Sequence, residues 1–238
     1  MMRAGALRVG AAVSACVGLA AVAGCGSDDV ADSPGSGPFS APVTAAPGTS
    51  AVVRDAARLS AGLLAATDLP GDFAVVAPRG DAAEPAVPPA APTDPPDCGR
   101  LLSPIAQQWP GSAAAASVQF AGPSFATIDI DAASYPDAAL APAFAALQAQ
   151  PRRCSSYSGD DAGVRIEYRT SALAQPPAGD AGSAFTLTAT SDGLTLTSAT
   201  SLVQVGNTLV QVVVTAPEVV DPGVLSDLTA AQVRKLRG

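Results

Sequence analysis

The sequence contains no histidine, and Lys235 is its single lysine. Without histidine the chain cannot form a Ser-His-Asp triad, a Cys-His dyad or a histidine-ligated zinc site. Any catalysis would have to use carboxylates, serines, tyrosines or Lys235. That lysine lies among arginines near the end of the sequence, where solvent exposure is favoured over the burial by which a catalytic lysine lowers its pKa. The sequence therefore argues against most classes of enzyme.

Basic residues are also few: 13 Lys and Arg face 21 Asp and Glu, and the net charge is −8 at pH 7. Proteins that bind nucleic acid neutralise its phosphates with a basic patch, which this composition does not supply. The excess of acid would also repel anionic lipid. We therefore expect no nucleic-acid partner, and we expect any attachment to a membrane to rely on something other than charge.

The N-terminus has the layout of an export signal. Arg3 and Arg8 provide the positive start, and residues 9–23 are apolar and uncharged. A membrane-spanning helix needs about 20 apolar residues, so cleavage is favoured over spanning. The stretch "VAGC" that ends at Cys25 resembles a bacterial lipobox, in which the cysteine receives diacylglycerol and the chain is cut before it. Residues 1–24 are therefore predicted to be a lipoprotein signal peptide, and Cys25 the lipid attachment that anchors the protein to the extracytoplasmic side of the membrane.

The residues after Cys25 support this interpretation. The alternative is a buried structural cysteine after an ordinary secretion signal. Residues 26–49 consist mainly of Gly, Ser, Pro, Ala and Asp with one aromatic residue, and they have too few large apolar groups to bury a cysteine. We predict that residues 25–49 form a lipidated cysteine and a disordered tether, and that residues 50–238 form a single domain.

The remaining cysteines suggest a disulfide. Of the four cysteines, Cys16 leaves with the signal and Cys25 is lipidated, so Cys98 and Cys154 remain. Pairing is the expected state outside the cytoplasm, and two free buried thiols are the alternative. Closing a loop of this length would stabilise the fold by about 4 kcal/mol in the loop-entropy model.

Periodicity predicts the secondary structure of the domain. Apolar residues at spacings of three and four predict helices that begin at Ser50 and that cover 100–108, 137–150 and 221–237. Alternation of apolar and polar residues predicts strands at 116–120, 125–135, 164–171, 183–191, 194–205 and 208–216. Residues 78–97 contain seven prolines and are predicted to form a loop.

These elements predict one α+β domain: a curved antiparallel sheet of about six strands with helices packed on one face. Gly206-Asn207 is predicted to form a tight hairpin, because both residues tolerate positive φ. The apolar positions change from even to odd between Leu196 and Val203, which predicts a bulge near residues 198–201.

Four stretches resemble a known family: "LLAATDLPGDF" at 63–73, "PPDCGRLL" at 95–102, "RRCSSYSG" at 152–159 and "VQVGNTLVQVVVTA" at 203–216. With them, residues 50–238 resemble actinobacterial envelope lipoproteins related to the extracellular sensor domain of mycobacterial serine/threonine kinase H. The resemblance implies an envelope ligand-binding or interaction domain with a central groove. The kinase sensor carries two disulfides, whereas this chain has cysteines for one. A group of actinobacterial lipoproteins with an α/β/α sandwich is an alternative fold.

Carboxylates are the strongest catalytic candidates. Asp129, Asp131 and Asp137 form the densest acidic set, and a pair of them would suit a hydrolase that acts on envelope glycans. Asp129 and Asp131 alternate with Ile128 and Ile130, so the favoured interpretation places them on the solvent face of a strand. No neighbour is evident that would raise one pKa, as an acid catalyst requires.

Other candidate sites are weaker. A calcium loop that starts at Asp129 would have Ser134 in place of glycine and Leu140 in place of glutamate, so this interpretation fails. Ser124 lies in "GPSFA", which lacks the last glycine of a nucleophile elbow and any histidine base. Residues 158–163, "SGDDAG", could bind a cation weakly but have the composition of an ordinary turn. We expect no metal and no cofactor.

The few aromatic residues could contribute to a ligand site. Trp109, Tyr135, Tyr157 and Tyr168 could line a groove, although packing in the core is favoured for each. The sequence thus predicts a lipid-anchored extracytoplasmic sensor or ligand-binding domain without catalytic activity. Its expected partners are the membrane and a small-molecule, lipid or glycan ligand or an envelope protein. The alternatives are the carboxylate-dependent hydrolase and a structural interaction protein.

Overall fold

The computed structural model describes residues 39–48, 52–76, 92–217 and 219–238. The predicted signal peptide, Cys25, residues 25–38 of the predicted tether and most of the proline-rich loop lie outside these ranges. The predictions for those segments are therefore not addressed by the structure.

The described residues form a nine-stranded sheet in the order β1-β3-β4-β9-β8-β7-β6-β5-β2, in which every neighbouring pair is antiparallel. The strands are β1 (Ala74–Val75), β2 (Thr93–Asp94), β3 (Ala114–Ala121), β4 (Thr127–Ser134), β5 (Ser156–Asp161), β6 (Val164–Ala172), β7 (Ala181–Ser191), β8 (Leu194–Val205) and β9 (Thr208–Ala216). The predicted antiparallel α+β architecture is confirmed, but the prediction of about six strands is wrong. The additional strands are β1 and β2, which have two residues each, and the polar β5.

Four α-helices and three short 3-10 helices complete the described fold. They are α1 (Ala56–Ala61), α2 (Ile105–Gln108), α3 (Asp137–Arg153), α4 (Pro222–Arg237), η1 (Ala66–Asp68), η2 (Pro96–Leu102) and η3 (Pro123–Phe125). Helix α4 begins as predicted, because the Asp221 side chain accepts a hydrogen bond from the Gly223 N–H and Pro222 occupies the first turn.

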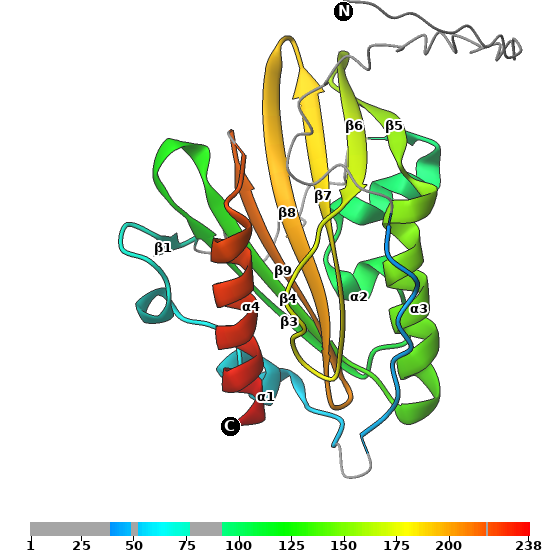
Figure 1. Cartoon of the computed structure of the whole chain (residues 1–238), viewed down its shortest axis with the longest axis vertical. Helices are drawn as coiled ribbons and strands as arrows, with labels where there is room; N and C mark the ends of the chain where they lie inside the picture. The colour runs from blue at the N-terminus through cyan, green and yellow to red at the C-terminus, as the bar shows by residue number, and fades with distance from the viewer. Residues whose placement is uncertain (1–38, 49–51, 77–91, 218) are drawn as a thin grey trace, which may run out of the picture. The chain divides into compact units, whose positions relative to one another are not determined.

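The helices lie on both faces of the sheet, and the prediction of helices on one face is therefore wrong. Successive residues of a strand point to opposite faces. Ala132 and Val210 belong to the apolar cluster that contains α1 and α4, whereas Ala133 and Leu209 pack with Phe144 of α3. In Figure 1, α1 and α4 (red) accordingly lie next to each other and apart from α3.

This two-sided cover also explains why the predicted bulge is absent. The pairing of β8 with β7 and with β9 runs without interruption through residues 198–201. From Ala199 to Val205 every residue of β8 is buried, because helices cover both faces of the sheet at this point. The apolar positions change along β8 because its first part is exposed or half-buried, whereas its second part is buried on both faces. The hairpin at Gly206-Asn207 is confirmed, with Val205 paired to Thr208.

Residues 39–48 differ from the disordered tether that the sequence predicts. They run along α3, and Ala45 is buried in the cluster that contains Leu140 and Phe144. Gln148 and Gln204 bond the backbone of Val43 and Ala46 respectively. Small residues thus pack closely against the domain here even though the segment has few large apolar groups.

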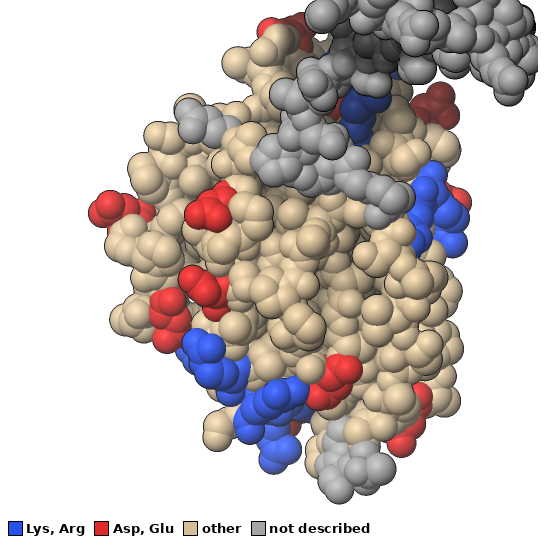
Figure 2. All heavy atoms as spheres, viewed as in Figure 1, with Lys and Arg blue, Asp and Glu red and all other residues tan. Residues whose placement is uncertain are grey.

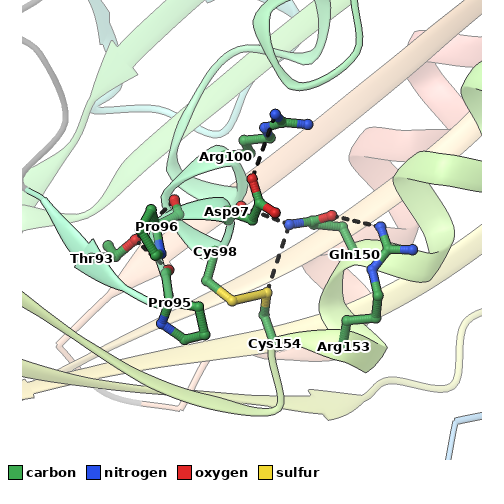
Figure 3. Close-up of polar contacts among 9 residues, drawn as sticks. All are labelled: Thr93, Pro95, Pro96, Asp97, Cys98, Arg100, Gln150, Arg153 and Cys154. Carbon is green, nitrogen blue, oxygen red and sulfur yellow. Dashed lines mark hydrogen bonds and ion pairs between the residues drawn. A yellow bond between two sulfur atoms is a disulfide. The ribbon is translucent and has the colours of Figure 1, made fainter.

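The predicted disulfide is present between Cys98 and Cys154. It joins η2 to the residue that ends α3, and both cysteines are buried with Tyr157 and Phe185. Gln150 supports the same junction, since its side-chain amide donates to the Asp97 carbonyl and accepts from Arg153 (Figure 3). The bridge therefore holds η2, which follows β2 in the chain, to the C-terminal end of helix α3.

Candidate functional site

The edge of β7 is uncovered over its first residues. Strand β6 ends at Ala172, which pairs with Phe185, whereas β7 already begins at Ala181. Residues 181–184 have β8 as their strand neighbour on one side. On the other side the connection 173–180 adds a backbone hydrogen bond from the Leu173 N–H to the Ala184 carbonyl at 3.3 Å, and residues 181–183 have no strand neighbour there among the described residues. The connection is held at its end by Asp180, whose N–H donates to the Gln204 carbonyl at 2.8 Å.

A groove of about 720 Å³ lies along this open edge. One side is formed by residues 39–43 and the last turns of α3, and the other side by the connection 173–180 and helix α4. Residues 181–185 of β7 and Ser201 and Val203 of β8 also line it. Because α3 and α4 cover opposite faces of the sheet, the groove collects residues from both faces at the point where β6 stops.

Hydroxyl groups line the part of the groove next to α4. Thr229 is 3% exposed, and its Oγ1 has no hydrogen-bond partner among the described residues. Ser201 of β8 and Ser226 of α4 line the same part, and Ser201 is also buried. A buried hydroxyl without a partner costs about 1–3 kcal/mol, and Thr229 bears this cost at a position in the groove lining.

The lining contains one cation, Arg152, at the side formed by residues 39–43. Its guanidinium donates to the Ser40 carbonyl at 2.7 Å and lies 5.1 Å from the centre of the Phe39 ring. The lining anion, Asp180, is already paired with Arg237 at 2.8 Å. Within the ranges that the structure describes, the partners of Arg152 are neutral, so its charge is available to an anionic group.

The rest of the lining is apolar or neutral. It includes Val43, Pro151, Leu173, Pro176, Pro177, Ala178, Phe185 and Val203. Figure 2 shows the same character on a larger scale, because the broad central area of the visible face is uncharged and the acidic and basic residues lie around it. The groove therefore suits a ligand with an apolar body and a small number of polar groups.

The predicted carboxylate pair lies elsewhere, on β4. Asp129 and Asp131 point to the face opposite Ile128 and Ile130, as the alternation predicts. Asp129 accepts hydrogen bonds from Gln119 Nε2 at 2.6 Å and from Thr127 at 3.0 Å. Both carboxylates lie outside the lining of the groove.

The environment of these carboxylates differs from the prediction that no neighbour would raise a pKa. Both side chains are half-buried. Loss of solvent raises the pKa of Asp131 to about 7, with a smaller contribution from the negative charge of Asp129. Burial also raises the pKa of Asp129, although its hydrogen bonds from Gln119 and Thr127 act in the opposite direction. Helix α2 packs on β4 and β9, and its Gln108 bonds Gln211, the β9 partner of Asp131, so this face is partly covered, which alternation alone does not reveal.

The tyrosines belong to the core, as the favoured interpretation holds. Tyr135 is fully buried and donates to the Trp109 carbonyl at 3.0 Å, and burial raises its pKa to about 12. Tyr157 and Tyr168 stack with ring centres 4.7 Å apart. Trp109 is partly buried against the cluster around α3. These four residues lie outside the groove lining.

The remaining candidates have structural roles. Lys235 pairs with Asp68 at 2.5 Å, and its hydrogen bond lowers the pKa of that carboxyl. Residues 158–163 form the end of β5 and its turn, where Asp160 accepts from the Gly163 N–H. Ser124 lies in a turn between β3 and β4. No group of three or more Cys, Asp or Glu suited to a metal occurs within the described ranges.

Sequence reasoning missed the groove because its lining residues are ordinary in type. Alanines, prolines, serines and one threonine carry no catalytic or ligand signature. The groove arises because the first four residues of β7 extend beyond the end of β6. This overhang depends on the register in which the two strands pair. The "QPPAGDAG" stretch at 175–182, which has two prolines between two predicted strands, was the available signal.

Among the described residues, no helix is long and apolar enough to cross a membrane. No protein-family model and no curated protein matches the sequence. Among solved structures, the extracellular domain of PknH from Mycobacterium tuberculosis matches with a TM-score of 0.58 and 17% identity, covering 80% of this chain and 99% of that one. The resemblance expected from the sequence is therefore confirmed for the fold. A Rv0999 ortholog from Mycobacterium smegmatis matches with a TM-score of 0.39 and 15% identity, covering 72% and 93% of the two chains.

Proposed function

We propose that this protein is a lipid-anchored, extracytoplasmic ligand-binding domain that senses or carries its ligand without converting it. The observation that carries the proposal is the groove at the open edge of β7, whose lining includes Thr229, a residue with a buried hydroxyl that has no hydrogen-bond partner within the described part of the chain. The fold shared with the PknH extracellular domain is consistent with a sensor-like role.

The lining suggests the class of ligand. Apolar side chains and neutral hydroxyls favour a molecule with an extended apolar body, and the single available cation, Arg152, favours one anionic group at one end. An amphiphile such as a fatty acid or a related envelope lipid combines these features. A volume of about 720 Å³ is in the range of known small-molecule sites.

Binding of parinaric acid, a fluorescent fatty acid, tests this proposal. We expect saturable binding to the mature protein, and we expect Thr229→Val to weaken it about fivefold, since a net hydrogen bond contributes about 1 kcal/mol. Thr208→Val is the matched control, because the Thr208 hydroxyl is also buried and has no partner among the described residues but lies outside the groove. Both variants should fold, because valine has the shape of threonine and removes an unsatisfied group. Absence of saturable binding to the unaltered protein, or equal weakening by both variants, would contradict the proposal.

The anchor has its own test. Protein isolated from cells should begin at a lipidated Cys25 by intact mass and should partition into detergent. The Cys25→Ser variant should leave the membrane fraction, since acyl chains contribute about 0.8 kcal/mol per buried methylene to membrane binding. A variant that stayed wholly in the membrane fraction would place the anchor elsewhere.

A glycan hydrolase is the second candidate, and one observation favours it. The raised pKa of Asp131, about 7, is the property that a carboxylic acid needs to act as a general acid near neutral pH. Its test is turnover of envelope glycans by the purified protein, measured against an Asp129→Asn, Asp131→Asn double variant. Activity that disappears in the double variant while the fold persists would replace the binding proposal with the hydrolase.

A further inference from the structure

Large apolar side chains are exposed at the hairpin end of the sheet. The most exposed is Phe125, at 87%, and Leu194 and Val219 are 77% and 74% exposed. Val164 and Leu196 are exposed to a lesser degree. We call Phe125, Val164, Leu194, Leu196 and Val219 the apolar tips.

Strand register places these residues at one end of the sheet. The β3–β4 hairpin turns next to the Ala121–Thr127 pair, and Thr127 is paired in turn with Thr215 near the end of β9. The β7–β8 and β5–β6 hairpins turn at the same end, beyond the pairs Ser191–Leu194 and Asp161–Val164. In Figure 1 these turns lie toward the top, and the Gly206 hairpin lies at the opposite end.

Phe125 is held outward at a conformational cost. Both Ser124 and Phe125 have positive φ, of 53° and 62°. A non-glycine residue in this region is strained by its Cβ, and exposure of the ring forgoes the stabilisation of its burial. Strain and apolar exposure at one residue point to a function for the exposed side chain.

The described N-terminal segment begins in the half of the domain that is nearer this end. Phe39 packs with Tyr157 and Leu187 beside the last turn of α3, and the chain then runs to Ala46, which Gln204 bonds near the Gly206 hairpin. Residues 26–38 lie between the predicted lipid on Cys25 and Phe39. A chain of that length can span at most about 50 Å. With a lipid on Cys25, the hairpin end is therefore within reach of the bilayer.

We propose that the apolar tips dock on the surface of the lipid bilayer in which Cys25 is anchored. This inference rests on the proposed lipid anchor. The tips supply apolar contacts that enter the interfacial layer, and the acidic chain makes zwitterionic lipid the better surface. In this orientation the connection 173–180 and the start of β7 lie toward the end of the domain that faces away from the membrane.

Fluorescence quenching by brominated lipid tests the orientation. The full lipidated chain, with Trp109→Phe to remove its single tryptophan, is reconstituted in phosphatidylcholine vesicles that carry brominated acyl chains. Phe125→Trp and, separately, Leu194→Trp place a reporter at the tips. Val52→Trp is the matched control, because Val52 is 67% exposed and precedes Arg54, which bonds Ser134 at the opposite end of β4.

We expect loss of most tryptophan emission at positions 125 and 194 and little loss at position 52. Vesicle-bound protein without quenching at either tip would overturn the docking proposal while leaving the anchor intact. Protein that fails to bind the vesicles would contradict both. Unquenched tips in pure lipid that cross-link to a protein in whole envelopes would assign the surface to a protein partner instead.

Discussion

The side-chain amide of Gln148 forms two hydrogen bonds with the backbone of Val43: it accepts from the Val43 N–H at 2.9 Å and donates to the Val43 carbonyl at 2.6 Å. Gln204 makes the same pair of contacts with Ala46. Two glutamines thus bond the N-terminal segment as a neighbouring strand would. Because Phe39, Ser40, Ala41 and Val43 line the groove, this segment forms one of its walls.

Replacing Gln148 should release this wall without unfolding the domain. Gln148→Leu removes two hydrogen bonds, which together contribute about 2 kcal/mol, so amide hydrogen exchange of residues 39–46 should accelerate about thirtyfold. Gln107→Leu is the control, because Gln107 lies on the exposed side of α2. Equal exchange in the two variants would show that apolar packing of Ala45, and not the amide contacts, holds the segment.

Gly179 should tolerate no side chain. It has a φ of +68°, and a Cβ there would lie 2.3 Å from the Gln204 carbonyl oxygen. Gly163 also has positive φ, at +87°, but has open space around it. Gly163→Ala should therefore cost about 1–2 kcal/mol of unfolding free energy, and Gly179→Ala a further 1–3 kcal/mol because the connection 173–180 must shift. Urea denaturation checks both values, and equal costs would contradict the close approach.

The disulfide should contribute a large part of the stability. Cys98 and Cys154 are 56 residues apart, and a closed loop of that length is worth about 4 kcal/mol in the chain-entropy model. Cys98→Ala, Cys154→Ala should therefore lower the unfolding midpoint substantially, because net domain stability is only about 5–15 kcal/mol. The unaltered protein under reducing conditions should unfold at a similar midpoint. Free thiols in the protein isolated from its native cells would contradict the bridge itself.

The long elements of the fold follow from sequence pattern. Strands such as β9 and helices such as α4 have strong periodicity, and their burial agrees with it. The short strands β1 and β2 could not be predicted, because two residues carry no period and their pairing depends on distant partners. The helix at α3 was predicted, but the face of the sheet that it covers was not. Its sequence is rich in alanine, and alanine positions on a helix do not reveal which sheet face they contact.

The candidate site was less predictable than the fold. The pairing of Cys98 with Cys154 could be predicted from the number of cysteines alone, because these two remain once Cys16 and Cys25 are assigned to the signal peptide and the lipid anchor. The groove depends on where β6 ends relative to β7, and on the glutamines that bond residues 39–48. A glutamine that bonds a distant backbone has the same letter as one that faces solvent. The position of the groove wall is therefore determined by contacts between residues more than 100 positions apart, which local sequence pattern does not reveal.

Asp131 lies opposite Gln211 of β9 and Ser117 of β3, in a position where burial raises its pKa to about 7. An unfolded aspartate has a pKa of about 3.9, so between about pH 4 and pH 7 the native state binds a proton that the unfolded state has released. Stability must then fall as the pH rises through this window, because ionisation of native Asp131 is opposed by desolvation. Above pH 7 native Asp131 is ionised, and the full free-energy cost of desolvating its charge lowers the stability.

Asp131→Asn should remove this dependence. The neutral amide requires no ionisation, so the variant should be more stable than the unaltered protein at pH 8, by up to about 4 kcal/mol for a shift of this size, and nearly equal to it at pH 4. Urea denaturation at pH 4, 6 and 8 measures the difference. Asp192→Asn, at an exposed turn, is the control and should leave the slope unchanged. A slope that persisted in Asp131→Asn would assign the titration to another group, with Asp129 the first to replace, because burial raises its pKa in the same direction.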